Sequence, residues 1–382
     1  MKRLHATVCL LLIICLAAPA AMAAKQTEAP YSPEYEQRVG AQAAAQVEKE
    51  YERWEDEEAQ KRVDAVVTEL AKASTRPEVE YDVRLLDTDM VNAFSLPGGI
   101  IYVTKGLLNE VQSDHELAGV LAHEIAHNCT YDALIQADRN KELFTGSMAV
   151  AIATILAGAD SDMVSTVLVT GELVRRGVLG GYSIEMERAA DAHAVEFLLN
   201  TSYDPVGLLT FMERLAAKEN RQPQPELGVS KTHPLPQKRV QALADQIYEA
   251  GLEINRRATT EWEQPVAEQV EGGSEGEKYV RVALWGEEIF RVLTPGPEHD
   301  SPMARAEAIA ARLTEALKAG MREHEVSVSA TGESAKLIGR GVTIITVHPA
   351  DAEAQGTEVQ ALAGQARAAL QRVLFKEKLD RL

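Results

Sequence analysis

The sequence contains few cysteines. Only three of its 382 residues are cysteines, and Cys9 and Cys15 both lie within the first 23 residues. Without that leader Cys129 is the single thiol, so the chain has no internal disulfide and its stability must come from a hydrophobic core or a bound metal. Cys129 could serve as a soft metal ligand, but it follows His127 by two positions and faces another side of the same predicted helix. A buried, inert thiol is therefore the favoured interpretation.

Basic residues are outnumbered by acidic ones. The sequence has 39 lysines and arginines against 58 aspartates and glutamates, a formal net charge of −19. Nucleic acids and anionic membrane surfaces repel a polyanion, and no basic tract offsets the imbalance. The composition therefore argues against a nucleic-acid partner. Its 46% of hydrophobic and 25% of charged residues are typical of a globular protein with a real core.

The N-terminus has the features of a secretory signal peptide. Two basic residues precede the apolar run 8–18, and the small residues of "AMA" at 21–23 suit a signal peptidase. We predict a cleavable signal peptide over 1–23 and an exported protein, which the lack of disulfides places most simply in a periplasm. The apolar run is too short to span a bilayer. Cys15 lacks the small preceding residue of a lipidation site, so we do not predict a lipoprotein.

Two further apolar stretches occur at 148–159 and 162–174. Each has about a dozen residues, whereas a helix that crosses a bilayer needs about 20. We predict that both are helices packed on the rest of the protein, with contact to a membrane surface as the alternative. The mature chain is thus predicted to have no transmembrane span.

Patterns along the chain predict an α+β fold with two domains. Helical spacing dominates 34–254, interrupted by strand patterns at 80–88 and 100–103, which predicts a mainly helical domain with a small β-sheet. The acidic, glycine-containing segment 255–278 is predicted to be a linker. Residues 279–382 alternate strand and helix patterns and predict a small, separate α/β module.

Within that module the pattern predicts one hairpin and later strands and helices. The hairpin is expected to turn at Gly286, with strands near 325–330 and 341–347 and helices over 302–319 and 351–376. The module carries no recognisable chemical motif. We interpret it as an accessory module that could dock a partner.

The stretch "VLAHEIAHNC" at 120–129 predicts a metal site. Ser113, followed by Glu116, indicates the start of a helix that runs through it. His123 and His127 lie four residues apart on one helix face, so both imidazoles can reach one ion. Glu124 points away from that ion but can reach a water bound to it, as the general base of a zincin does. Such a short pattern also arises by chance, so a third ligand must be found elsewhere.

The stretch "EMERAADAHAV" offers that ligand. Glu187 and Asp191 are four residues apart on a predicted helix and lie among alanines and a valine, which is unusual for surface carboxylates. Glu187 can therefore bind the metal, while Asp191 orients a ligating histidine through its other ring nitrogen. Glu185 lies about 200° away around the helix and cannot share that face.

A resemblance to a known family rests on four stretches that occur in this order: "NAFSLPGG", "LAHEIAH", "ERAAD" after Tyr182, and "THPLPQKR". Together they resemble the gluzincin metallopeptidase family that contains BepA, HtpX and the CAAX prenyl proteases. The similarity covers about residues 34–250 and points to a soluble, exported, BepA-like branch. It implies a zincin-type fold and one Zn²⁺ per subunit, with His123, His127 and Glu187 as its ligands. Many relatives continue differently after the second histidine, which leaves the specificity of this chain open.

The resemblance also places two further residues near the metal. The histidine of "THPLP" falls on His233, which in some relatives occupies the open metal position as a latch. An imidazole there could instead stabilise the oxyanion of a tetrahedral intermediate. Arg239 could act in the same way, hold a carboxylate, or form a purely structural ion pair.

The predicted activity is zinc-dependent cleavage of unfolded or misassembled envelope proteins, outer-membrane proteins among them, in protein quality control. Glu124 would act as the general base. The substrate is expected to pair as an added strand with the exposed edge formed by Gly99, Ile100, Ile101, Tyr102 and Val103. We expect Asn92 and Phe94 to shape the rim of the site, although "NAFSLPGG" could simply be a tight hairpin. The alternative function is a metal-containing chaperone or adaptor that binds exported polypeptides without cleaving them.

Overall fold

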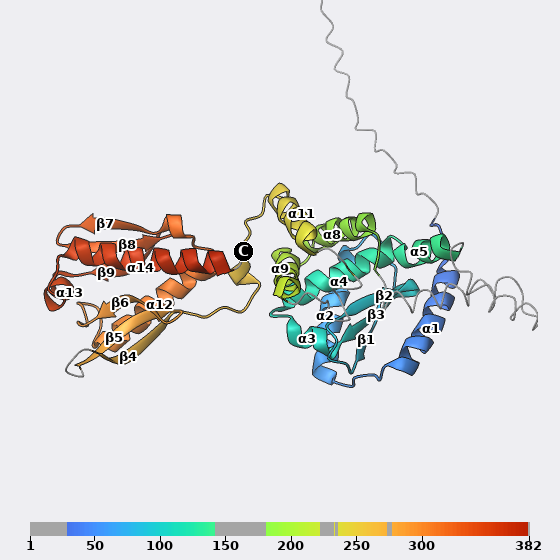
Figure 1. Ribbon diagram of the computed structural model, residues 1–382, viewed down its shortest axis with the longest axis horizontal. Coiled ribbons are helices and arrows are strands. Elements are labelled where there is room, and N and C mark those ends of the chain that lie inside the picture. The colour runs from blue at the N-terminus through green and yellow to red at the C-terminus, as the bar shows by residue number, and fades with distance from the viewer. Residues whose placement is uncertain (1–28, 142–180, 222–232, 234–235, 273–276, 381–382) are drawn as a thin grey trace, which may run out of the picture.

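The computed structural model of the chain describes residues 29–141, 181–221, 233, 236–272 and 277–380 (Figure 1). The predicted signal peptide and the apolar stretches 148–159 and 162–174 lie outside these residues. Among the residues that are described, none forms a helix long and apolar enough to cross a membrane.

In the residues that the structure describes, the N-terminal domain is mainly helical with a small sheet, as predicted. Its elements are α1 (Pro33–Glu50), α2 (Glu57–Ala73), β1 (Asp82–Leu86), β2 (Ala93–Leu96), η1 (Pro97–Gly99), β3 (Ile100–Thr104), α3 (Lys105–Glu110), α4 (Asp114–Cys129), α5 (Asp132–Lys141), α8 (Ile184–Leu198), α9 (Val206–Arg221) and α11 (Pro236–Glu249). The strand order is β1-β3-β2, with β3 parallel to β1 and antiparallel to β2.

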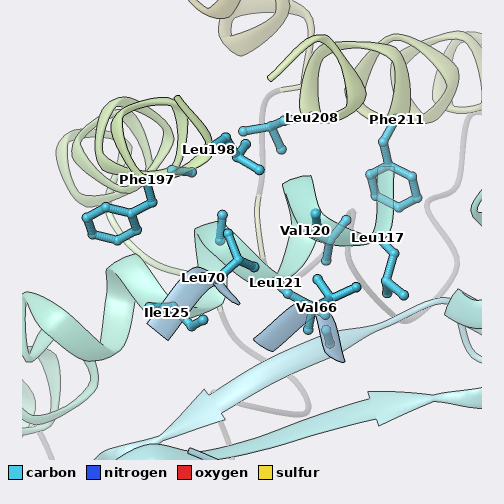
Figure 2. Packing of buried hydrophobic residues seen from close by; sticks show 14 of the residues in the cluster. Val66, Leu70, Leu117, Val120, Leu121, Ile125, Phe197, Leu198, Leu208 and Phe211 are labelled. Atoms are coloured by element: carbon cyan, nitrogen blue, oxygen red, sulfur yellow. The ribbon is translucent and has the colours of Figure 1, made fainter. Parts of the chain in front are cut away.

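The sheet separates two hydrophobic cores. On one face Phe94 and Tyr102 pack against α1. On the other face Ile101 and Val103 join a larger core built with α2, α4, α8 and α9. Figure 2 shows how residues such as Leu70, Leu121 and Phe197 meet in that larger core around α4. The helix that carries the histidine motif is therefore enclosed on several sides.

Helix α4 begins at the predicted cap. The Ser113 Oγ accepts a hydrogen bond from the Glu116 backbone N–H at 3.2 Å, and the Glu116 carboxylate accepts one from the Gln112 N–H at 2.8 Å. From Glu116 to Cys129 every residue of the helix is buried. α9 crosses α4 so closely that a Cβ at Gly119 would lie 2.7 Å from the Leu208 Cα. A glycine at this position permits the close packing of the two helices.

The C-terminal domain contains two antiparallel three-stranded sheets and their helices. Its elements are β4 (Val266–Gly272), β5 (Glu277–Leu284), β6 (Glu287–Val292), α12 (Pro302–Lys318), η3 (Glu323–Glu325), β7 (Ser327–Thr331), β8 (Ser334–Gly339), β9 (Val342–Val347), α13 (Pro349–Ala354) and α14 (Val359–Asp380). The sheets have the orders β4-β5-β6 and β7-β8-β9. The predicted α/β module is thus present, with more strands than expected.

The two sheets repeat one pattern. Each sheet is a three-stranded meander whose second hairpin turns at a residue with positive φ followed by glycine, at Trp285-Gly286 and at Arg340-Gly341. Each also has a register shift in its middle strand, at Val282/Ala283 and at Leu337/Ile338. The number of residues between the two turns equals the number between the two register shifts. The domain therefore contains an internal repeat of three strands followed by a helix.

The predicted linker 255–278 contains regular structure. It includes η2 (Arg256–Ala258) and the whole of β4, which pairs with β5 along seven residues. β4 is rich in polar residues, so it has the composition of a linker although it belongs to a sheet. One of these residues, Glu268, forms an ion pair with Arg281 at 2.7 Å.

The segment between the domains is hydrogen-bonded to both of them. On the N-terminal side the Ser113 Oγ donates to the Thr259 carbonyl at 2.6 Å, and Arg256 pairs with Glu213 at 2.6 Å. On the C-terminal side the Asn255 amide donates to the Lys318 carbonyl at 2.7 Å. These contacts make the first part of the predicted linker an ordered connection.

Candidate metal centre

Helices α4 and α8 bring the predicted metal ligands together. His123 and His127 project from one face of α4, and Glu187 comes from the first turn of α8, which packs against it. His233, just before α11, enters the same place. One ligand atom from each of these four buried residues lies within 4.8 Å of the others.

The ligand atoms converge on one point. The Nε2 atoms of His123 and His127 are 3.1 Å apart. The His233 Nδ1 lies 3.2 Å from the His123 Nε2 and 2.9 Å from the Glu187 Oε1. A tetrahedral zinc ion with bonds of about 2.0–2.1 Å holds its ligand atoms about 3.3 Å apart. The spacing and the nitrogen and oxygen donors therefore fit a zinc ion.

The outward ring nitrogens of the two motif histidines face carboxylates. The His123 Nδ1 lies 3.0 Å from the Asp191 Oδ1, and the His127 Nδ1 lies 2.7 Å from the Asp132 Oδ2. A carboxylate partner keeps the proton on Nδ1, so the Nε2 lone pair is directed at the centre. The structure thus places Asp191 beside the outward ring nitrogen of His123.

Asp132 and Tyr182 are parts of the site that sequence reasoning did not assign. Asp132 starts α5, directly after Tyr131, whose backbone has φ 59°. That turn places the carboxylate beside His127. The Tyr182 ring stacks against His127, with 4.0 Å between ring centroids. The contact with His127 could have been predicted from one feature of the sequence, the carboxylate of Asp132 five residues after this histidine.

Arg239 is held between two carboxylates. Its Nη2 and Nε lie 2.6 and 2.8 Å from the two Asp191 oxygens, and its Nη1 lies 2.6 Å from the Glu187 Oε2. Burial would raise the pKa of Asp191, but the charge and hydrogen bonds of Arg239 outweigh it and lower the pKa to about 2. Of the three roles considered for Arg239, this geometry favours the holding of carboxylates.

Glu124 lies between β2 and His233. Its Oε2 accepts a hydrogen bond from the Ser95 backbone N–H at 3.1 Å, and its Oε1 is 3.3 Å from the His233 Nε2. Burial alone would raise the pKa of Glu124, but the charge and hydrogen bond of His233 outweigh it and lower the pKa below its usual value. The carboxylate is therefore ionised at neutral pH, as a general base must be.

His233 is completely enclosed by the site. Burial opposes its protonation, but the charges of Glu187 and then of Glu124 outweigh burial and raise the pKa of His233 to about 10. One imidazole thus contacts both Glu187, a candidate metal ligand, and the candidate base.

The substrate strand predicted from the sequence is wrong. β3, which begins at Ile100, is the central strand, hydrogen-bonded to β1 on one side and to β2 on the other, so it has no exposed edge. The side chains assigned to it are core residues. Phe94 does not form a rim either, because it stacks on Tyr102 with 5.1 Å between ring centroids, on the face that α1 covers. Asn92 is buried, and its backbone N–H donates to the Thr104 Oγ1 at 3.0 Å.

The strand next to the metal centre is β2. It is an edge strand among the residues that the structure describes, it packs against α4, and its Ser95 N–H reaches Glu124. The glycines of "NAFSLPGG" form the tight turn expected of them, since Gly98 and Gly99 have φ values of 77° and 89°.

Comparisons with known proteins agree with this centre. The profile of peptidase family M48 matches residues 57–247, half of the chain. A domain of unknown function, DUF8459, matches residues 281–377, within the C-terminal domain.

Three curated relatives are similar over the N-terminal domain. The mitochondrial metalloendopeptidase OMA1 of Schizosaccharomyces pombe is 28% identical over 188 residues, which are 49% of this chain and 53% of that protein. The beta-barrel assembly-enhancing protease of Escherichia coli is 30% identical over 161 residues, 41% of this chain and 32% of that protein. The metalloprotease LoiP of Escherichia coli is 28% identical over 192 residues, 50% of this chain and 72% of that protein. The chain spans about half the length of OMA1 and about a third of that of the beta-barrel assembly-enhancing protease.

Proposed function

Because the chain belongs to peptidase family M48, we propose that it is a zinc-dependent endopeptidase acting on unfolded or misassembled proteins of the cell envelope. The observation that carries the proposal is the convergence of four ligand atoms beside Glu124. One relative supports the choice of substrate by its name, the beta-barrel assembly-enhancing protease, and the name of metalloprotease LoiP supports the proteolytic activity. The predicted signal peptide at 1–23 and a periplasmic location belong to the same proposal.

In this proposal His123, His127 and Glu187 hold the zinc ion. When bound, zinc supplies Lewis acidity for the scissile carbonyl and acidifies a water. Asp191 and Asp132 orient the two imidazoles through their Nδ1 atoms. Arg239 offsets part of the negative charge of Asp191 and Glu187, which would otherwise be buried next to each other without a counter-charge.

Glu124 acts as the general base. It is ionised at neutral pH, and its orientation is set by the Ser95 N–H, which donates to its Oε2. It takes a proton from the attacking water and later delivers it to the leaving amine. Since Ser95 lies on the edge strand β2, we place the substrate backbone along β2 as an added strand.

His233 acts as a latch in this proposal. Its Nδ1 occupies one position of the ligand cluster, while its Nε2 engages the Oε1 of Glu124. The same ring therefore covers a metal position and one oxygen of the base. It must move aside before a water and a substrate carbonyl can enter.

The latch geometry also favours a second candidate function. A site closed by His233 would hold polypeptides without cutting them, as a metal-containing chaperone or adaptor does, with the C-terminal domain as a docking site for a partner. Glu124 argues against this second function. Its carboxylate is buried, ionised and directed at the centre, and a protein that only binds has no use for a general base.

The test compares wild type with Glu124→Gln on one unfolded envelope protein. The variant should keep its zinc and its fold but lose about 10²-fold or more in turnover, because only the base is removed. It should also capture uncleaved substrates. Glu185→Gln, which changes an exposed glutamate on α8, is the matched control and should cleave like wild type. Equal turnover of wild type and Glu124→Gln would show that Glu124 is not the base or that a contaminant cleaves the substrate. Absence of cleavage by zinc-loaded wild type would refute the enzymatic proposal and leave the binding protein.

A further inference from the structure

Arg76, in the segment between α2 and β1, contacts three separate parts of the chain. Its Nη2 and Nη1 donate to the two carboxylate oxygens of Glu36 on α1, at 2.9 and 3.1 Å. The same Nη1 donates to the backbone carbonyl of Asn128, in the last turn of α4, at 3.3 Å. The guanidinium carbon also lies 4.3 Å from the centroid of the Tyr131 ring. One side chain therefore joins α1 to the turn between α4 and α5.

The ion pair between Arg76 and Glu36 is largely buried, with 14% and 3% of the two side chains exposed. Two charges removed from water stabilise a fold only when their geometry is good, and two N–H groups donating to one carboxylate supply that geometry. Burial would lower the pKa of Arg76, but the hydrogen bonds and charge of Glu36 outweigh it and raise the pKa. Glu36 therefore holds a permanently charged guanidinium in a fixed place at the end of α4.

The turn that Arg76 contacts has an unfavourable backbone conformation. Tyr131 has a φ of 59°, in the left-handed region that only glycine adopts without a steric penalty. Its N–H donates to the Asn128 carbonyl at 3.2 Å, which closes the turn. Arg76 donates to that same carbonyl and lies over the Tyr131 ring, a favourable contact between a cation and an aromatic face. It therefore holds both ends of the turn.

The turn determines where the Asp132 carboxylate lies. Asp132 follows Tyr131 directly, and its Oδ2 is 2.7 Å from the His127 Nδ1. With Tyr131 at an ordinary negative φ, the chain would leave α4 in another direction and carry the carboxylate away from the imidazole. In the part of the chain that the structure describes, Arg76 bonds to neither Asp132 nor His127. Its influence on the metal centre must therefore pass through the turn.

We propose that Arg76 is a positioning residue of the metal centre, which holds Tyr131 in its left-handed conformation and so keeps the Asp132 carboxylate on His127. This inference rests on the zinc centre of the proposed function. Arg76 lies outside the four stretches on which the family resemblance depends, and no motif assigns it to the site. The affinity of the centre for zinc thus depends on an ion pair between α1 and the segment after α2, neither of which supplies a ligand.

The test is the zinc affinity of Arg76→Lys, measured by competition with a chelator of known affinity. Lysine keeps a positive charge opposite Glu36, but it lacks the planar fork that bonds a carboxylate, a carbonyl and a ring face together. We expect zinc to bind about tenfold more weakly, the lower end of the loss typical for a missing partner of a ligating histidine. Arg84→Lys is the matched control and should bind zinc like wild type, because Arg84 also pairs with a carboxylate and lies over a tyrosine ring, but its partners lie on α1 and in the sheet. Equal affinities in the two variants would overturn the proposal.

A double-mutant cycle separates positioning from a general loss of structure. In Asp132→Ala the carboxylate that Arg76 positions is absent, so adding Arg76→Lys should cause no further loss of zinc affinity. A second loss of about tenfold in that background would show that Arg76 does not act through Asp132, and would overturn the proposal. If Arg76→Lys does not fold, Arg76→Gln combined with Glu36→Gln removes both charges of the buried pair and takes its place in the cycle. A wild-type protein that binds no zinc would instead contradict the proposed metal centre.

Discussion

The Nε2 of His233 lies 3.3 Å from the Oε1 of Glu124, so the residue closing the metal centre also engages the candidate base. If this contact is a latch, His233→Ala should raise turnover, by about tenfold where nine-tenths of the molecules are latched. If His233 instead stabilises the oxyanion, the same change should lower turnover by about 10²–10³. The measurement is turnover of one unfolded substrate at matched zinc occupancy.

His193→Ala is the control for that experiment. His193 is a partly exposed histidine on α8 that pairs with the exposed Glu196, so its removal should leave turnover unchanged. A large drop in His233→Ala, with His193→Ala unaffected, would exclude the latch.

Glu187→Ala should lose most of its zinc. Glu187 supplies an oxygen to the cluster, and its removal leaves only histidine ligands next to the buried Arg239 charge. We expect most of the zinc and all activity to be lost, measured as metal per chain after gel filtration. Glu185→Ala removes an exposed carboxylate two residues away and should retain its zinc. Stoichiometric zinc in Glu187→Ala would show that another residue is the third ligand.

Asp132→Ala should weaken zinc binding without removing a ligand. The Asp132 carboxylate holds the His127 Nδ1 at 2.7 Å, and loss of such a partner typically costs 10–100-fold in metal affinity. Competition with a chelator of known affinity measures the change. Asp245→Ala, at an exposed position of α11, provides the baseline. Equal affinities in the two variants would show that Asp132 does not position His127.

A chain that ends at Thr260 should fold, bind zinc and cleave a short peptide. It retains the bond between Ser113 and Thr259 and ends before β4. A chain that ends at Lys278 should be less stable and prone to aggregation, because it contains β4 without most of its partner strand β5. Thermal unfolding, gel filtration and zinc content compare the two. Aggregation or zinc loss in the shorter chain would mean that the domains depend on each other to fold.

Local rules explain the elements that were predicted well. The cap at Ser113 and the turn at Gly286 depend on residues close together in the sequence, so their positions could be read directly. β4 and β8 were missed because their residues are largely polar or small. The helix expected over 351–376 is divided into α13 and α14 around Gly356, whose φ is 62°.

The sequence by itself determined the chemistry of the candidate centre. Helix geometry places His123 and His127 on one face, and the same spacing relates Glu187 to Asp191, so the ligand types followed from positions four apart. Only the tertiary structure decided that the His233 ring contacts both Glu187 and Glu124, and that Asp132 pairs with His127. It also decided that Ile100–Thr104 is a central strand and not an edge. Those are relations between segments distant in the chain, or depend on one backbone turn, and no local pattern of residues encodes them.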